Sequence, residues 1–244
     1  MPREWDATTY DALTLPHEQW GRLVLDRMRL SGDERVLDAG CGTGRDAAAL
    51  RERWPGVRLV ELDGSQQMLD VARGRLGDDG VTYVQADLRQ PLPLDETVDA
   101  VMSVAAFHWV PDHAALFEHL AAVLRPGGRL TSDCGGHGNV ADVSRAIADV
   151  SGQAGTEWEF ADDVATRSRL EAAGFEAERV SLRPDPFRCD DPDVLETYLA
   201  TVVLGARLDV LPADEHETFV REVRHALSEP VVDYVRLEID AVRR

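Results

Sequence analysis

The chain has 244 residues, with 45 Asp and Glu against 26 Lys and Arg, so its formal net charge at pH 7 is −19. All of those basic residues are arginine. The absence of lysine excludes a Walker-type phosphate lysine and a Schiff-base lysine. The acidic balance argues against a nucleic-acid substrate, because binding to a phosphate backbone requires basic residues.

Length and hydropathy favour one α/β domain that buries a full core. No apolar run reaches the ~18 residues that a membrane span requires, and residues 1–6 hold no apolar core of a secretion signal. Cys41, Cys134 and Cys189 share no metal-ligand spacing and cannot all pair. We therefore expect a cytoplasmic protein with no metal, no membrane contact and no nucleic-acid partner. The sequence does not indicate its oligomeric state.

The whole chain is expected to form a single domain in three parts. Residues 1–30 would form a helical cap, which carries Tyr10 and Trp20. Residues 31–135 would form a ligand-binding core, and residues 136–244 a second half on the substrate side.

A glycine-rich loop opens the core. An apolar strand containing Asp38 runs into Gly40, Gly42 and Gly44, and an alanine-rich helix follows over roughly residues 43–53. Alternate glycines let the backbone turn sharply and approach a ligand closely. The helix also directs the positive end of its dipole at this point. The arrangement predicts a nucleotide site, either for a dinucleotide or for S-adenosylmethionine (SAM).

The next strand ends in two acids, Glu61 and Asp63. An acid about 20 residues beyond the glycine loop is placed to accept hydrogen bonds from ribose hydroxyls. We select Asp63 because it is the last acid before the turn. The alternative is that Asp63 only caps the helix expected from about Gln66.

Two further strands bring more candidate residues to the same edge of a sheet. The third predicted strand, residues 81–88, carries Asp87 near its end, and the fourth, from residue 98, carries Ser103 and Val104. Then we expect a helix, a Pro-Gly-Gly turn and a fifth strand, over residues 116–124, 126–128 and 129–133.

In order and spacing, these features resemble class I SAM-dependent methyltransferases of types 11 and 25 and the trans-aconitate methyltransferase-like group. The resemblance rests on the pattern Asp-x-Gly-x-Gly-x-Gly over residues 38–44, the acids at 63 and 87, and the Pro-Gly-Gly turn. It is strongest over residues 30–135, and it implies SAM as cofactor and S-adenosylhomocysteine as product. The implied cofactor-binding residues are Asp38, Gly40, Cys41, Gly42, Asp63, Gly64, Met68, Asp87, Leu88, Ser103 and Val104.

Within that set, the resemblance implies ribose contacts from Asp63 and Gly64 and adenine contacts from Asp87 and Leu88. Ser103 and Val104 would lie near the methionine part of SAM. Asp38 would orient the glycine loop and face the methionyl ammonium, and Met68 would pack on the adenine.

His108 and Trp109 follow the fourth strand, close to where the methyl group would lie. Trp109 is expected to form a wall of the substrate pocket or to contact the sulfonium by cation–π attraction. His108 is a candidate base or carboxylate partner. His137, in a glycine-rich loop after the fifth strand, is a second candidate base. Trp20 and Tyr10 complete the candidate substrate-binding set.

The stretch Phe107–His113 is similar to the corresponding stretch of trans-aconitate and related carboxyl methyltransferases. This implies a small-molecule acceptor and, more narrowly, O-methylation of a carboxylate, which needs no base and would be bound by Arg or His. Two alternatives stay open: a non-catalytic SAM-binding protein and a NAD-dependent oxidoreductase. The third glycine of the dinucleotide fingerprint G-x-G-x-x-G would fall at Arg45, and Asp87 is of the adenine-binding type, so both residues oppose the oxidoreductase.

Alternation of strands and helices at about 25-residue intervals predicts a parallel sheet with ligands at its carboxyl edge. We expect an α/β, Rossmann-like sheet of seven mostly parallel strands, with helices on both faces and an antiparallel last strand. The second half would supply helices, a sixth strand, a helical insert and the last strand, over about residues 140–152, 162–173, 176–182, 190–228 and 231–241.

Overall fold

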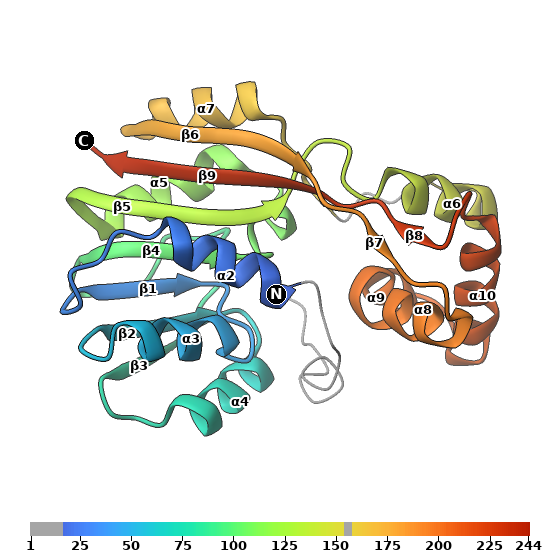
Figure 1. The fold of residues 1–244 in the computed structure, drawn as a ribbon, viewed down its shortest axis with the longest axis horizontal. Helices are drawn as coiled ribbons and strands as arrows, with labels where there is room; N and C mark the ends of the chain where they lie inside the picture. Colours follow the sequence, from blue (N-terminus) through green and yellow to red (C-terminus); the bar gives the residue numbers. More distant parts are fainter. Residues whose placement is uncertain (1–16, 154–157) are drawn as a thin grey trace.

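The structure, a computed structural model, describes residues 17–153 and 158–244, so Tyr10 lies outside the described residues. Its centre is a seven-stranded sheet of order β3-β2-β1-β4-β5-β9-β6 (Figure 1). The strands are β1 (Arg35–Ala39), β2 (Arg58–Asp63), β3 (Val81–Gln85), β4 (Val98–Val104), β5 (Leu124–Gly135), β6 (Phe175–Pro184) and β9 (Val235–Arg243).

Strand direction confirms the expected Rossmann-like architecture. The pairs β1–β2, β2–β3, β1–β4 and β4–β5 are parallel. The last strand, β9, lies between β5 and β6 and is antiparallel to both. Because β1 to β4 run in one direction, their carboxyl ends meet at one edge, and the candidate cofactor residues are found at that edge.

Helices cover both faces of the sheet, as predicted. One face carries α2 and α3, whose Val24 and Leu50 are fully buried against the β1, β2 and β4 side chains. The other face carries α5 and α7, with Phe117, Leu120 and Leu170 fully buried. The helices flanking the sheet are α2 (His17–Arg27), α3 (Arg45–Arg53), α4 (Gln66–Leu76), α5 (His113–Val123) and α7 (Asp163–Ala172).

A helical lobe extends beyond the carboxyl edge of β5 and β6, on the right of Figure 1. It has a core of its own, in which Ile147, Leu195, Leu199 and Val223 are buried. A two-stranded ribbon links it to β6 and β9. Its elements are α6 (Ala141–Ser151), β7 (Phe187–Arg188), α8 (Pro192–Tyr198), η2 (Leu199–Val203), α9 (Gly205–Leu208), η3 (Ala213–Glu215), α10 (His216–Ala226) and β8 (Val231–Val232).

Several boundaries differ from the prediction for local physical reasons. α5 begins at His113 rather than at 116, because the Asp112 carboxylate accepts the N–H groups of Ala114 and Ala115 at 3.0 and 3.1 Å and so caps the helix there. The expected turn over residues 126–128 is instead an irregularity within β5, where the register against β4 shifts. No helix in the described ranges has the length and apolar character needed to cross a bilayer.

Candidate functional site

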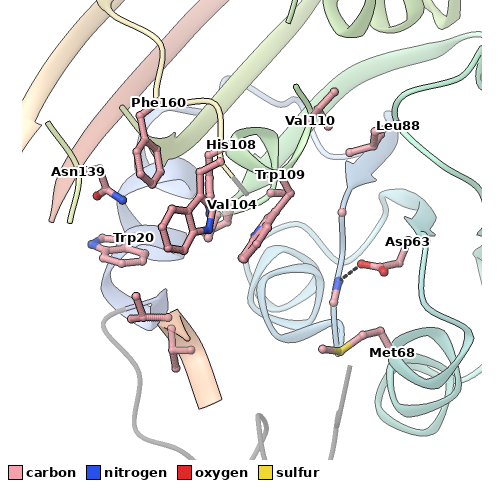
Figure 2. A pocket seen from close by; sticks show the side chains of 18 of the residues that line it. Trp20, Asp63, Met68, Leu88, Val104, His108, Trp109, Val110, Asn139 and Phe160 are labelled. Carbon is pink, nitrogen blue, oxygen red and sulfur yellow. Dashed lines mark hydrogen bonds between the residues drawn. The ribbon is translucent and has the colours of Figure 1, made fainter. Parts of the chain in front are cut away.

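A cavity of about 280 Å³ lies where the carboxyl edge of the sheet meets the helical lobe (Figure 2). Figure 2 shows Asp63 and Met68 at one end, Trp20 and Asn139 at the other, and His108 between them. The cavity brings together most of the residues selected from the sequence, namely Trp20, Gly40, Gly42, Asp63, Gly64, Met68, Asp87, Leu88, Val104, His108 and Trp109.

The glycine loop shapes one wall of this cavity through its missing side chains. Gly40 has φ +82°, and a Cβ there would lie 2.4 Å from the Cβ of Ala106. Gly42 has φ +53°, and a Cβ on it would meet nothing within 4 Å. The backbone can therefore turn under a ligand and leave room for it.

The N–H groups of the loop are used differently from the prediction. The N–H groups of Gly40 and Cys41 both donate to the Leu62 carbonyl, at 2.8 and 3.1 Å. The N–H of Gly42 donates to Asp63 Oδ2 at 2.9 Å. These hydrogen bonds connect the loop to the end of β2. Since all three N–H groups already have an acceptor within the protein, the loop would accommodate a ligand through the close approach of its backbone.

The Asp63 carboxylate on this wall is held by two backbone N–H groups. Its Oδ2 accepts from Gly42, as drawn in Figure 2, and its Oδ1 accepts the N–H of Ser65 at 2.9 Å. A carboxylate oxygen can accept more than one hydrogen bond. The capping alternative is not needed, because Ser65 is the N-cap of α4 and its Oγ accepts the N–H of Met68. The geometry thus supports Asp63 as a hydroxyl-binding carboxylate.

Asp87 lines the same wall but already has a partner. The Arg89 guanidinium donates from Nε and Nη2 to both of its oxygens, at 2.6 to 3.0 Å. Hydrogen bonds from Arg89 hold the pKa of Asp87 below its usual value. Arg89 is exposed, so this pair lies at the rim of the cavity.

Three predicted cofactor residues, Asp38, Cys41 and Ser103, do not line the cavity. All three are buried behind its wall. Ser103 Oγ donates to the Ala39 carbonyl at 2.7 Å, which joins β4 to β1 under the loop. Burial raises the pKa of the Cys41 thiol, which makes it a poor nucleophile. Their positions fit support of the glycine loop rather than direct contact.

Two carboxyl groups, those of Asp38 and Glu61, are buried together beneath the loop. Glu61 is fully buried and Asp38 is 2% exposed. Among the described residues, neither of the two Glu61 carboxyl oxygens has a hydrogen-bond partner, and Asp38 Oδ2 has none either. Burial, and then the charge of Glu61, raises the pKa of Asp38 well above its ordinary value. Burial raises the pKa of Glu61 from 4.5 to about 8.

Glu61→Gln is expected to flatten the pH dependence of stability. Between pH 4.5 and about 8 the folded protein retains a proton on Glu61 that the unfolded chain releases, so Glu61 lowers stability as pH rises through this window. A neutral glutamine removes this loss. Urea unfolding at several pH values across the window measures it, with Glu52→Gln, an exposed position on α3, as the matched control. Parallel pH curves for wild type and Glu61→Gln would contradict it.

Backbone strain is concentrated at the cavity. In the described chain, the non-glycine residues with positive φ are Ala105, at +56°, and Val140, at +48°. Both line the cavity. Left-handed backbone costs about 1–3 kcal/mol and is especially unusual for a β-branched residue. Strain of this kind persists where the surrounding structure fixes it, commonly at ligand sites.

The structure assigns a proton position to His108, which lines the cavity. Its Nδ1 accepts the N–H of Gly135 at 3.3 Å, so the neutral ring carries its proton on Nε2. A neutral His108 therefore has a donor and not an acceptor at Nε2, so it cannot take a proton there. His137, the second candidate base, is exposed and does not line the cavity, so it is not placed to act on a ligand there.

The far end of the cavity holds residues that the sequence reasoning missed. Trp158 and Phe160 stack at 5.4 Å between ring centroids, and Trp109 lies 6.1 Å from Trp158. Tyr234 and Arg236, on or next to β9, complete this end. No local motif marks these residues, because they come from segments far apart in the chain. Within residues 17–153 and 158–244, no three His, Cys, Asp or Glu side chains group as metal ligands would.

Comparison with known proteins identifies the core. Residues 36–128 match the family model of a methyltransferase domain. These residues are therefore similar to a methyltransferase domain. The cofactor of this family is SAM, and the carboxylate, glycines and apolar side chains of the wall suit its adenosyl part.

The methyltransferase domain also has curated and structural relatives. The chain is 35% identical to trans-aconitate 2-methyltransferase of Escherichia coli K12 over 127 residues, 52% of this chain and 49% of that protein. The chain therefore spans about half the length of the curated relatives it matches. YcgJ from Bacillus subtilis shares the fold with a TM-score of 0.68 and 18% identity, over 93% of this chain and 99% of that one. The [4+2]-cyclase SpnF matches with a TM-score of 0.61 and 20% identity, over 93% and 80%.

Proposed function

We propose that this protein transfers a methyl group from SAM to a small-molecule acceptor. The fold alone does not decide this, since SpnF, a [4+2]-cyclase, shares it. The observation that carries the proposal is one continuous cavity with two chemically different ends. One end presents Asp63 and the glycine loop, and the other presents an aromatic wall that includes Trp158 and Phe160.

The described residues have distinct tasks in this proposal. Asp63 and Asp87 would bind hydroxyl and amino groups of the adenosyl part, with Met68 and Leu88 as apolar contacts. When bound, SAM supplies an electrophilic methyl group on a sulfonium. The chain then has to hold the acceptor in line with that methyl group and exclude water, which accounts for much of the acceleration in such a displacement.

We further propose that the acceptor atom is a carboxylate oxygen. A carboxylate has no proton to lose, so it suits a site whose histidine, His108, presents a donor and not a base. The partial similarity to trans-aconitate 2-methyltransferase points the same way. A hydrogen bond from His108 Nε2 would orient the carboxylate.

Calorimetry with S-adenosylhomocysteine, followed by incubation with tritiated SAM and a metabolite extract, tests the proposal. We expect saturable binding and transfer of label to a small molecule. Absence of binding would overturn the proposal. Binding without any transfer of label would favour the non-catalytic alternative, and a change in nicotinamide absorbance during turnover would favour the oxidoreductase.

His108→Ala is expected to leave S-adenosylhomocysteine affinity unchanged and to lower methyl transfer at least about tenfold, the cost of one hydrogen bond to a charged group. His108→Asn, which restores an N–H donor, is expected to recover part of the rate. His137→Ala is the matched control and should behave as wild type. Full activity of His108→Ala would remove His108 from the acceptor site. A rate that rises with pH as a histidine loses its proton would indicate a base instead.

A further inference from the structure

Arg236 is a buried cation at the acceptor end of the cavity. It is 1% exposed, lies on β9 and lines the cavity. Its Nε donates to Asp133 Oδ1 at 2.7 Å. Its Nη2 is 2.6 Å from the same oxygen, but within the described chain this buried nitrogen has no partner with hydrogen-bond geometry. A guanidinium has five N–H donors, so Arg236 retains donors that a single carboxylate does not satisfy.

The other arginine that lines the cavity, Arg89, differs in this respect. The two oxygens of Asp87 accept from both its Nε and its Nη2, and the side chain is exposed at the rim. Solvent satisfies the rest of its donors. In the described lining, the buried cation with donors left for a ligand is therefore Arg236.

The surroundings of Arg236 fix its guanidinium in place. Its central carbon lies 3.6 Å from the centre of the Trp20 ring, in cation–π geometry. Trp20 is itself held, because its Nε1 donates to Asp185 Oδ2 at 2.5 Å and its ring meets Tyr234 edge-on at 5.0 Å. Donors that are fixed before binding lose little entropy when a ligand arrives.

The aromatic wall beside Arg236 indicates the shape of that ligand. Trp158 and Phe160 are stacked with an interplanar angle of 17°, and Figure 2 shows Phe160 and Trp20 at the same end of the cavity. Flat rings favour a flat, unsaturated body stacked against them. A polycarboxylate would need several cations with unused donors, whereas this end offers one.

We propose that Arg236 binds a carboxylate of the acceptor, and that the acceptor is a planar, unsaturated monocarboxylic acid. This inference rests on the proposed function and specifies its substrate class. The planar fork of a guanidinium matches the two oxygens of a carboxylate. Arg236 acts as a specificity-determining residue, because it selects acceptors with one negative charge next to a flat body.

The test uses the full chain saturated with S-adenosylhomocysteine and titrated with trans-cinnamate, a planar monocarboxylate, by calorimetry. We expect saturable binding, with trans-cinnamamide at least about tenfold weaker because it lacks the charge, and trans-aconitate also weaker. Arg236→Met should abolish the preference for the acid over the amide. Arg183→Met is the matched control, because Arg183 Nη2 is 3.6 Å from the same Asp133 but does not line the cavity; it should keep the preference.

The ratio of the wild-type affinities for trans-cinnamate and trans-cinnamamide tests the proposal even if Arg236→Met fails to fold. As a second safeguard, the double variant Asp133→Asn/Arg236→Met removes both buried charges together. No binding of cinnamate, equal binding of acid and amide, or equal effects of Arg236→Met and Arg183→Met would each overturn it. Failure to bind S-adenosylhomocysteine at all would instead overturn the proposed function.

Discussion

Asp63→Ala is expected to weaken binding of S-adenosylhomocysteine and SAM at least tenfold. Hydrogen bonds to a charged group contribute about 1.5–3 kcal/mol, which corresponds to between about tenfold and a hundredfold in affinity. The carboxylate of Asp63 is held for this task by the N–H groups of Gly42 and Ser65, both at 2.9 Å. Isothermal titration calorimetry of each variant measures the effect.

Two further variants separate a role of Asp63 in ligand binding from a role in holding the loop in place. Asp63→Asn keeps the shape and one acceptor oxygen but removes the charge, so we expect an intermediate loss. Asp70→Ala, at an exposed position on α4, is the matched control for removal of one negative charge and should bind normally. Unchanged affinity of a folded Asp63→Ala would remove Asp63 from the cofactor site.

The end of the cavity that holds Gly40, Asp63 and Asp87 could be predicted because its signals are local. Each residue there follows a parallel strand, and parallel strands place their carboxyl ends at one edge of the sheet. Gly40, Asp63 and Asp87 are therefore neighbours in space although about 20 residues separate each from the next. Fold class and the mostly parallel sheet follow from the same alternation of strands and helices.

The opposite end of the cavity could not be predicted in the same way, because it is assembled by tertiary packing. Trp20 comes from α2, Phe160 from the segment before α7, and Arg236 from the antiparallel β9, which lies beside β5. The sequence does indicate Trp20 as a candidate, but it does not indicate its contact with Arg236, because the two residues are more than two hundred positions apart in the chain. Arginine is rarely buried, so the sequence carries no signal that Arg236 lies in the interior, where Asp133 and Trp20 stabilise it.

Some details of the helical lobe could not be predicted from the sequence, for a different reason. Within the helical insert expected over about residues 190–228, the helix α8 changes at Leu199 to a π-helical segment that ends at Val203. Two of its residues, Val202 and Val203, line the cavity. Single π turns often occur at functional sites, but no residue pattern distinguishes them from ordinary helix. The β7–β8 ribbon has two residues in each strand, too few for a periodic signal.

Gly40→Ala is expected to lower the free energy of unfolding by about 3 kcal/mol and to weaken S-adenosylhomocysteine binding at least tenfold. The new Cβ would lie 2.4 Å from the Cβ of Ala106, at a backbone φ of +82° that alanine rarely adopts. The neighbouring loop cannot easily move away, because Ala105 already has a φ of +56° and its N–H donates to the Asp133 carbonyl at 2.7 Å.

Two other glycines provide controls that separate crowding from backbone strain. Gly42→Ala has φ +53° but no atom within 4 Å of its Cβ, so it should lose only about 1 kcal/mol of stability and fold normally. Gly74→Ala, at an exposed and open position within α4, should raise stability by up to about 1 kcal/mol. Urea unfolding and calorimetry of the three variants measure both effects. Equal stability of Gly40→Ala and Gly42→Ala would show that contact with Ala106 does not fix the shape of the loop, and that backbone conformation alone makes glycine necessary at both positions.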